Sequence, residues 1–238
     1  MKKFFCLLII AAHVSACATY SDHTVSFRPP NEYRNFQNSY GLLVGAESFA
    51  DKKDAEKAFG FDVRAAGVVP VQLVINNKSG QSMVVVSGQT FLIDSSNRYW
   101  KILTNREAVD RVKKAADSGI FSNSATKGAS GSVAAGSLMG LAIEIVSGRK
   151  IDSTAVKGET PGGTTGGGAG KAGEEKLREA RIAEDVRAKG IEGKIMAAES
   201  LASGFIFFPG EVSSVSELRL QIKLRDSGRI QTLNLKLN

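Results

Sequence analysis

The chain has 238 residues with a formal net charge of +7, and 42% of its residues are hydrophobic. That length suits one folded domain of ordinary size together with some irregular sequence. With only two histidines and two cysteines, the composition argues against a disulfide-rich scaffold, a histidine–cysteine metal site and a Ser-His-Asp triad, and no basic run is dense enough to indicate nucleic-acid binding.

The first residues have the layout of a secretory signal peptide. Two lysines are followed by an apolar run over residues 4–12, and small residues stand directly before a cysteine. The sequence Val14-Ser15-Ala16-Cys17 resembles the lipobox of bacterial lipoproteins. The resemblance implies that residues 1–16 are removed and that Cys17 becomes the lipidated N-terminus.

Two other interpretations of this stretch are an ordinary signal peptide with an incidental cysteine and an uncleaved anchor helix. A membrane-spanning anchor needs about 20 apolar residues, whereas this run is shorter and is followed by His13. Ala18 stands where an aspartate would resemble an inner-membrane retention signal. We therefore expect the N-terminal lipid to hold the protein at the outer membrane, facing the periplasm.

Residues 17–39 form a polar stretch that contains Pro29 and Pro30 and has no sustained hydrophobic period. Such a composition predicts an extended tether between the lipid and the folded domain, and the alternative is that Tyr33, Phe36 and Tyr40 pack on the domain and shorten its reach.

The first part of the folded domain is predicted over residues 40–118. A short helix is indicated at 51–59, where helix formers are followed by Gly60. Apolar residues alternate over 69–75 and resume after a glycine-containing turn, which indicates a hairpin or two sequential strands. Further short strands are predicted at 41–46, 83–86, 89–93 and 99–103.

Two residues near the end of this part make specific predictions. Trp100, the only tryptophan, is expected in the core rather than in a groove. Thr104 stands three residues before Glu107, which is the spacing of a capping box. The sequence therefore predicts a helix over 106–116, at the edge of the sheet.

Residues 119–200 interrupt the β pattern. Glycine, serine, alanine and threonine dominate up to residue 170, and this composition buries too little apolar surface to offset its ordering entropy. Small residues recur there at every fourth position and resemble the glycine zippers of bacterial envelope proteins: Gly128, Ser132, Gly136 and Gly140. The stripe fits a helix that packs on a partner or on the domain. A flexible insert and a membrane-inserted helix are the alternatives, although Glu144 argues against insertion.

The last part of the chain returns to regular structure. Residues 174–189 predict a charged, solvated helix that ends at Gly190. The domain is then completed by strands over 201–238, in which apolar and polar residues alternate, giving one apolar and one wet face. Ile230 falls out of phase with the later leucines, which predicts a β-bulge.

These elements predict a mainly β fold, an antiparallel β-sandwich interrupted by a glycine-rich, partly helical insertion. The strands Val-Gln-Leu-Val-Ile-Asn-Asn (71–77) and Ser-Gly-Phe-Ile-Phe-Phe-Pro (203–209) resemble those of immunoglobulin-like domains of bacterial envelope lipoproteins. The resemblance covers residues 40–104 and 201–238 and implies an immunoglobulin-like sandwich. It carries over no function and no functional residue.

The sequence favours a membrane-anchored envelope lipoprotein that acts as a non-enzymatic binding or structural module. We expect an envelope protein as its partner, contacted through the insertion, and no cofactor, metal, nucleic acid or small-molecule substrate. The alternative is a membrane-active or self-assembling protein that uses a zipper helix over 128–146. An enzyme is disfavoured because no catalytic pair stands out and the glycines at 162–170 lack the ending of a phosphate-binding loop.

Overall fold

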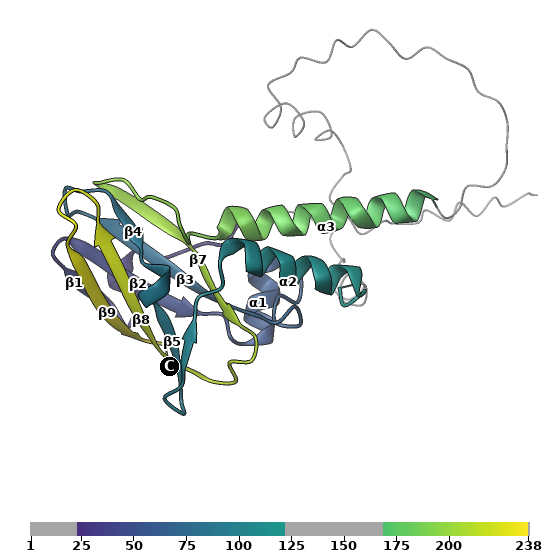
Figure 1. Cartoon of the computed structure of the whole chain (residues 1–238), viewed down its shortest axis with the longest axis horizontal. Coiled ribbons are helices and arrows are strands. Elements are labelled where there is room, and N and C mark those ends of the chain that lie inside the picture. Colours follow the sequence, from purple (N-terminus) through teal and green to yellow (C-terminus); the bar gives the residue numbers. More distant parts are fainter. Residues whose placement is uncertain (1–22, 122–168, 238) are drawn as a thin grey trace, which may run out of the picture.

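The computed structural model describes residues 23–121 and 169–237, which form a mainly β body with three α-helices (Figure 1). The strands are β1 (Gln37–Ser39), β2 (Leu42–Ser48), β3 (Val68–Asn77), β4 (Met83–Val85), β5 (Phe91–Asp94), β6 (Tyr99–Lys101), β7 (Ser200–Pro209), β8 (Val215–Leu224) and β9 (Ile230–Lys236). The helices are α1 (Lys52–Phe59), α2 (Asn105–Asp117), α3 (Ala169–Lys189) and the short 3-10 helices η1 (Pro30–Glu32) and η2 (Ser87–Gln89).

The strands form two antiparallel sheets. Sheet A has the order β1-β2-β3-β7, and sheet B has the order β4-β8-β5-β6 with β9 also paired to β8. The inner faces of both sheets enclose one apolar core. The predicted mainly β, antiparallel two-sheet architecture is thus confirmed.

Strand β8 shows how the sequence pattern builds this core. Its inward residues alternate with polar ones and are at most 3% exposed: Leu218, Leu220, Ile222 and Leu224. Each fully buried aliphatic side chain contributes about 1.5–3 kcal/mol relative to an exposed one. The alternation predicted for this strand is confirmed.

The turn after β3 carries the chain from one sheet to the other. β3 lies between β2 and β7, whereas β4 pairs with β8. The two strands therefore do not form a hairpin. The Asn77 side-chain amide fixes the crossing, because its Nδ2 donates to the carbonyls of Gln81 at 2.8 Å and Ala197 at 2.9 Å.

Strands β4 and β5 pair with successive stretches of β8, and η2 lies between them. In this gap the Gln221 N–H has no strand partner, and it donates instead to the buried Thr90 hydroxyl at 3.1 Å. The same hydroxyl donates to the Val86 carbonyl at 3.0 Å. A side chain thus replaces the missing main-chain partner, as burial of a polar group requires.

The predicted bulge in β9 is absent, because the register between β8 and β9 is continuous from Glu217 opposite Lys236 to Lys223 opposite Ile230. Ile230 keeps its phase by pointing outward, where it is 54% exposed, and Gln231 takes the inward position instead. The ladder thus stays continuous, and one aliphatic side chain is left in water.

Helix α1 agrees with its prediction in both bounds and caps. The Asp51 side chain accepts hydrogen bonds from the N–H groups of Lys53 and Asp54, and Gly60 ends the helix with a left-handed φ of 71°. Glycine adopts that conformation without the penalty that a Cβ atom imposes.

Helix α2 begins with the predicted capping box, in which the Thr104 and Glu107 side chains each bond the other residue's main chain. The preceding Leu103 N–H donates to the Phe207 carbonyl at 2.8 Å, so α2 starts beside the edge strand β7. The helix then packs lengthwise against α3, as Figure 1 shows.

Helix α3 differs from the prediction of a solvated helix. Ile182, Ala183 and Val186 are at most 3% exposed and belong to a second apolar core that also contains side chains of α1 and α2. We call α1, α2 and α3 the helix layer. It therefore includes residues that the sequence assigned to the insertion at 119–200.

Strand β7 is shared by the two cores. Ile206 and Phe208 face the core between the sheets, whereas Phe205 and Phe207 face the helix layer. The helix layer therefore covers the outer face of sheet A at this end, and sheet A is buried on both sides there.

The predicted extended tether over 17–39 is wrong from residue 23 onward, because residues 23–36, here called the strap, pack on the body. The Tyr33 ring is 5% exposed and covers Gly45, where an added Cβ would lie 2.5 Å from the ring. Beyond the strap, residues 37–39 form β1. The packing explains the difference, because Gly45 has no side chain and leaves room for the Tyr33 ring on the outer face of sheet A.

Side chains of the strap and β1 also close one side of the sandwich. Asn35 donates to the Lys236 carbonyl at 2.7 Å, the Gln37 amide donates to the Asn234 carbonyl, and the Ser39 hydroxyl donates to Gln231 at 3.1 Å. These bonds occupy the free edge of β9, which would otherwise offer unpaired groups to another strand.

Candidate functional site

The site residues predicted from the sequence lie outside the described residues. These are the lipidation residue Cys17 and the zipper residues Gly128, Ser132, Gly136 and Gly140. The structure does describe both flanks of the insertion, since the Phe121 carbonyl accepts a hydrogen bond from Arg178 of α3 at 3.0 Å. The Phe121 ring also packs on Phe61, with ring centroids 5.0 Å apart.

Within residues 23–121 and 169–237, no group of three or more histidine, cysteine, aspartate or glutamate side chains is placed to hold a metal ion. No helix in the same ranges is both long and apolar enough to cross a bilayer.

A groove of about 440 Å³ lies between the strap, α1 and the end of β2. Charges of both signs line it, and its Arg28 guanidinium pairs with Glu47 at 3.5 Å and stacks on the Tyr33 ring at 4.6 Å. The groove therefore presents no excess charge that would select a ligand.

The outer face of sheet B offers a more distinctive surface, which we call the open face. It consists of outward side chains of β5, β6, β8 and β9: Phe91, Ile93, Tyr99, Lys101, Glu217, Arg219, Lys223 and Lys236. Neither the helix layer nor the strap covers it, because both pack on sheet A.

Cross-strand register brings these residues together. Phe91 lies opposite Lys101 on one side and Arg219 on the other, so an aromatic ring separates two cations. Directly opposed residues in an antiparallel pair have Cβ atoms about 4.5–5.5 Å apart. Residues distant in sequence thus form one continuous row across three strands.

The open face carries an excess of positive charge. It has four cations and one carboxylate, Glu217, which amounts to 4 − 1 = +3. In the described part of the chain, none of the four cations is within ion-pair distance of an acidic group. Their field is therefore available to a partner.

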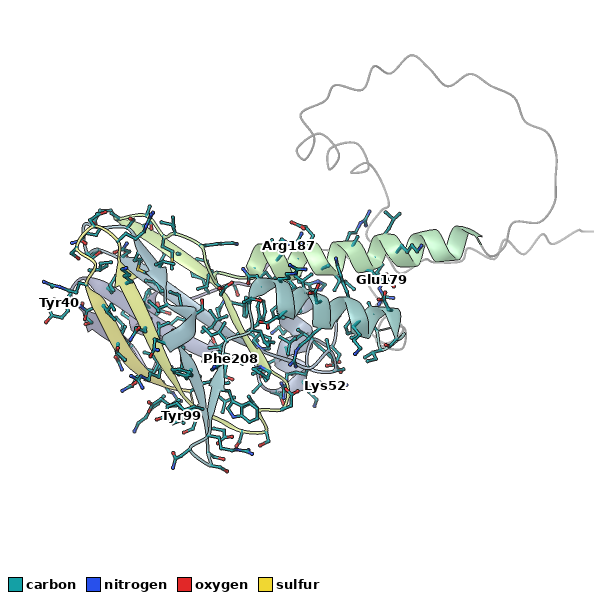
Figure 2. The ribbon with its side chains drawn as sticks, in the orientation of Figure 1. Tyr40, Lys52, Tyr99, Glu179, Arg187 and Phe208 are labelled. Carbon is teal, nitrogen blue, oxygen red and sulfur yellow. The ribbon has the colours of Figure 1, made fainter. Side chains whose placement is uncertain are left out.

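An aromatic pair lies at one end of the open face. Tyr99 is 58% exposed, and its ring meets the Phe91 ring edge-on with centroids 5.9 Å apart. Figure 2 shows Tyr99 on the β5–β6 side of the body, far from the labelled Arg187 of α3. The phenol offers an apolar ring and a hydroxyl that can donate or accept.

A buried carboxylate holds the β5–β6 hairpin that carries Tyr99. Asp94 is 1% exposed and accepts hydrogen bonds from the main-chain N–H groups of Ser96 and Arg98, the Arg98 guanidinium at 2.7 Å and the Trp100 indole at 2.9 Å. Arg98 also lies over the Trp100 ring, 5.4 Å from its centroid. The hairpin is thereby fixed from inside.

These bonds set the ionisation of Asp94. Burial alone would raise the pKa of the carboxyl, but hydrogen bonds from the Arg98 main chain, the Trp100 indole, the Arg98 guanidinium and the Ser96 main chain outweigh it and lower the pKa to about 2. Asp94 is therefore a structural anion at neutral pH.

Trp100 itself is half-buried rather than fully in the core. It packs against the core between the sheets while its indole N–H reaches Asp94. Because side chains alternate along β6, Trp100 points inward and its neighbour Tyr99 points outward.

Comparison with known proteins adds no assignment. No protein-family model matches the chain, and neither the sequence search nor the search of solved structures returns a significant match.

Sequence reasoning did not identify the open face. The alternation of Arg219, Gln221 and Lys223 with leucines indicated a wet face on β8, and this signal was visible. The pattern of one strand cannot give the register between strands, and only the pairing of β8 with β5 and β9 adds Phe91 and Lys236 to the same surface.

Proposed function

We propose that this protein is a lipid-anchored, non-enzymatic binding module of the cell envelope that engages an acidic protein surface through the open face. The observation that carries the proposal is a sheet face with the exposed Tyr99 at one end and four cations that, among residues 23–121 and 169–237, have no ion-pair partner and are covered by neither the helix layer nor the strap. The anchor and the outer-membrane location rest on the lipobox resemblance of Val14 to Cys17.

The composition of the open face favours a protein partner. Tyrosine and arginine are enriched among the residues that contribute most to protein interfaces, and aromatic side chains supply large contact areas at low entropy cost. Ile93 and Phe91 add apolar surface between the cations. A partner rich in carboxylates would complement the charge, which fixes orientation and accelerates association.

The body that presents the open face is, in this proposal, an immunoglobulin-like sandwich. Two antiparallel sheets around one core are compatible with that type. The finer assignment rests on the resemblance of residues 71–77 and 203–209 to strands of envelope lipoproteins.

The test is site-specific photocrosslinking in intact cells. A benzoylphenylalanine in place of the exposed Thr232, on β9 opposite Gln221, lies beside the cations without replacing one. We expect a protease-sensitive adduct with a protein whose captured surface is acidic. The double variant R219Q/K223Q should reduce the yield several-fold, and the loss should be smaller in high salt.

The matched control is K113Q/K114Q, which removes the same charge from the exposed side of α2 and should leave the yield unchanged. An adduct that is degraded by muramidase or extracted with lipid would contradict a protein partner. Equal loss in the two double variants would contradict the open face as the site.

A further inference from the structure

The strap fixes where the N-terminal end of the described chain leaves the body. The His23 ring packs on Gly60 at the end of α1, and Val25 packs against the apolar core of the helix layer. Tyr33 then covers Gly45 on the outer face of sheet A. Residues 23–33 therefore run along the side of sheet A, opposite to the open face of sheet B.

Covalent geometry limits how far Cys17 can lie from this point. Only residues 18–22 separate Cys17 from His23. Six residue steps span at most about 20 Å when fully extended. The two sheets are about 10 Å apart and the helix layer is about 10 Å thick, so a straight line through these layers is already about 20 Å long. A chain must go around the layers rather than through them, so its path from the strap to the outer side of sheet B is longer than residues 18–22 can span.

We infer that a lipid on Cys17 holds the body with its strap and α1 toward the anchoring bilayer and its open face away from it. This inference rests on the proposed lipidation of Cys17. It makes the strap an orienting element, because a free tether over residues 17–39 would let the body turn in any direction. The acidic partner is then bound on the side remote from the membrane that holds the lipid.

The orientation also explains why the open face can remain cationic. A basic, aromatic sheet face close to an anionic bilayer would be attracted to it, at about 1 kcal/mol per cation near the surface. Held at the far side of the body, the cations lie more than a Debye length of about 8 Å from that surface and are screened from it. They stay available for a protein.

The experiment uses the full-length lipidated protein in vesicles of phosphatidylethanolamine and phosphatidylglycerol that contain a nitroxide headgroup lipid. Because Cys17 is acylated in the mature chain, a single introduced cysteine carries a bimane label at either Lys57→Cys on α1 or Lys223→Cys on the open face. Quenching by the nitroxide should be several-fold stronger at position 57. Equal quenching, or stronger quenching at position 223, would overturn the inference.

A strap variant makes the test independent of the label positions. Gly45→Val would push the Tyr33 ring off sheet A, and the difference in quenching between the two positions should then shrink. The control Gly88→Ala has open space around its added Cβ and should preserve the difference. If the difference persists in Gly45→Val, the strap is not the orienting element.

The lipid anchor and the orientation of the body can each be contradicted without the other. Mass spectrometry of an unmodified thiol at Cys17, with no flotation on vesicles, would remove the lipid anchor and with it the proposed location. Flotation without a difference in quenching would leave the anchor and the open face intact and remove only the orientation.

Discussion

At the scale of single residues, Asp94 organises the region that carries Tyr99. Its carboxylate gathers four donors from the β5–β6 hairpin, and no outward residue of the open face takes part in these bonds. The strands predicted at 89–93 and 99–103 require a turn between them. The sequence could not indicate that the first turn residue points inward, because aspartate in turns is usually solvated.

The lowered pKa of Asp94 makes a pH prediction. A carboxyl whose pKa falls from 3.8 in the unfolded chain to about 2 in the folded protein stabilises the fold above pH 3.8 and loses that contribution as the pH falls toward 2. Asp94→Asn removes the negative charge and places an amide N–H₂ group, which is itself a donor, against the donors that surround Asp94. Urea unfolding at pH 7 should show a lower midpoint for Asp94→Asn, and the gap to the wild type should narrow between pH 4 and pH 2.

The control for this prediction is Asp110→Asn on α2, whose carboxylate is exposed and lies 3.8 Å from the Arg106 guanidinium. It should change the midpoint little at any pH. A constant gap for Asp94→Asn from pH 7 to pH 2 would contradict the assigned role of the charge.

At the scale of elements, α3 shows how a narrow apolar stripe can still bury a helix. Its inward residues Ile182, Ala183 and Val186 meet a face of α2 that is itself rich in alanine. Small residues let two helices approach closely, so few large side chains are needed. The sequence-based prediction of a solvated helix assumed that a buried helix needs a wide apolar stripe. It did not anticipate the alanine-rich face of α2, against which a narrow stripe suffices.

Two substitutions in α3 separate a packed helix from a solvated one. Ile182→Ala should destabilise the protein by about 2–5 kcal/mol because it leaves a cavity. Leu177→Ala, at a position that is 57% exposed, should change the stability by less than about 0.5 kcal/mol. Chemical denaturation measures both, and similar small effects would show that α3 is not held by the core.

At the scale of the whole molecule, β7 links the two apolar cores. Since Phe207 and Phe208 are neighbours on one strand but face different cores, neither core can loosen without disturbing the other. We therefore expect one cooperative transition. Fluorescence of Trp100 in sheet B and the helical circular dichroism should follow the same unfolding curve.

Substitution of Phe207 sharpens this prediction. Phe207→Ala removes a side chain of the helix-layer core. It should lower the free energy of unfolding by about 3–5 kcal/mol and shift both transitions together to lower denaturant. Phe27→Ala, at an exposed position, should leave both in place. If the helical signal were lost at lower denaturant than the Trp100 signal, the two cores would be independent.

Much of this architecture could be predicted because it depends on local pattern. The alternation in β8, the caps of α1 and the capping box of α2 each follow from spacing within a few residues. The docked strap, the crossing after β3 and the open face depend instead on contacts between distant segments. The sequence does not show which aromatic ring will cover a glycine such as Gly45.

The central strand of sheet B is made after two of the strands that pair with it, β4 and β5. β4, β5 and β9 all pair with β8, and β8 begins only at Val215. A nascent polypeptide that still lacks residues 215–224 therefore has no template on which to assemble that sheet, so sheet B cannot form until these residues have been synthesised.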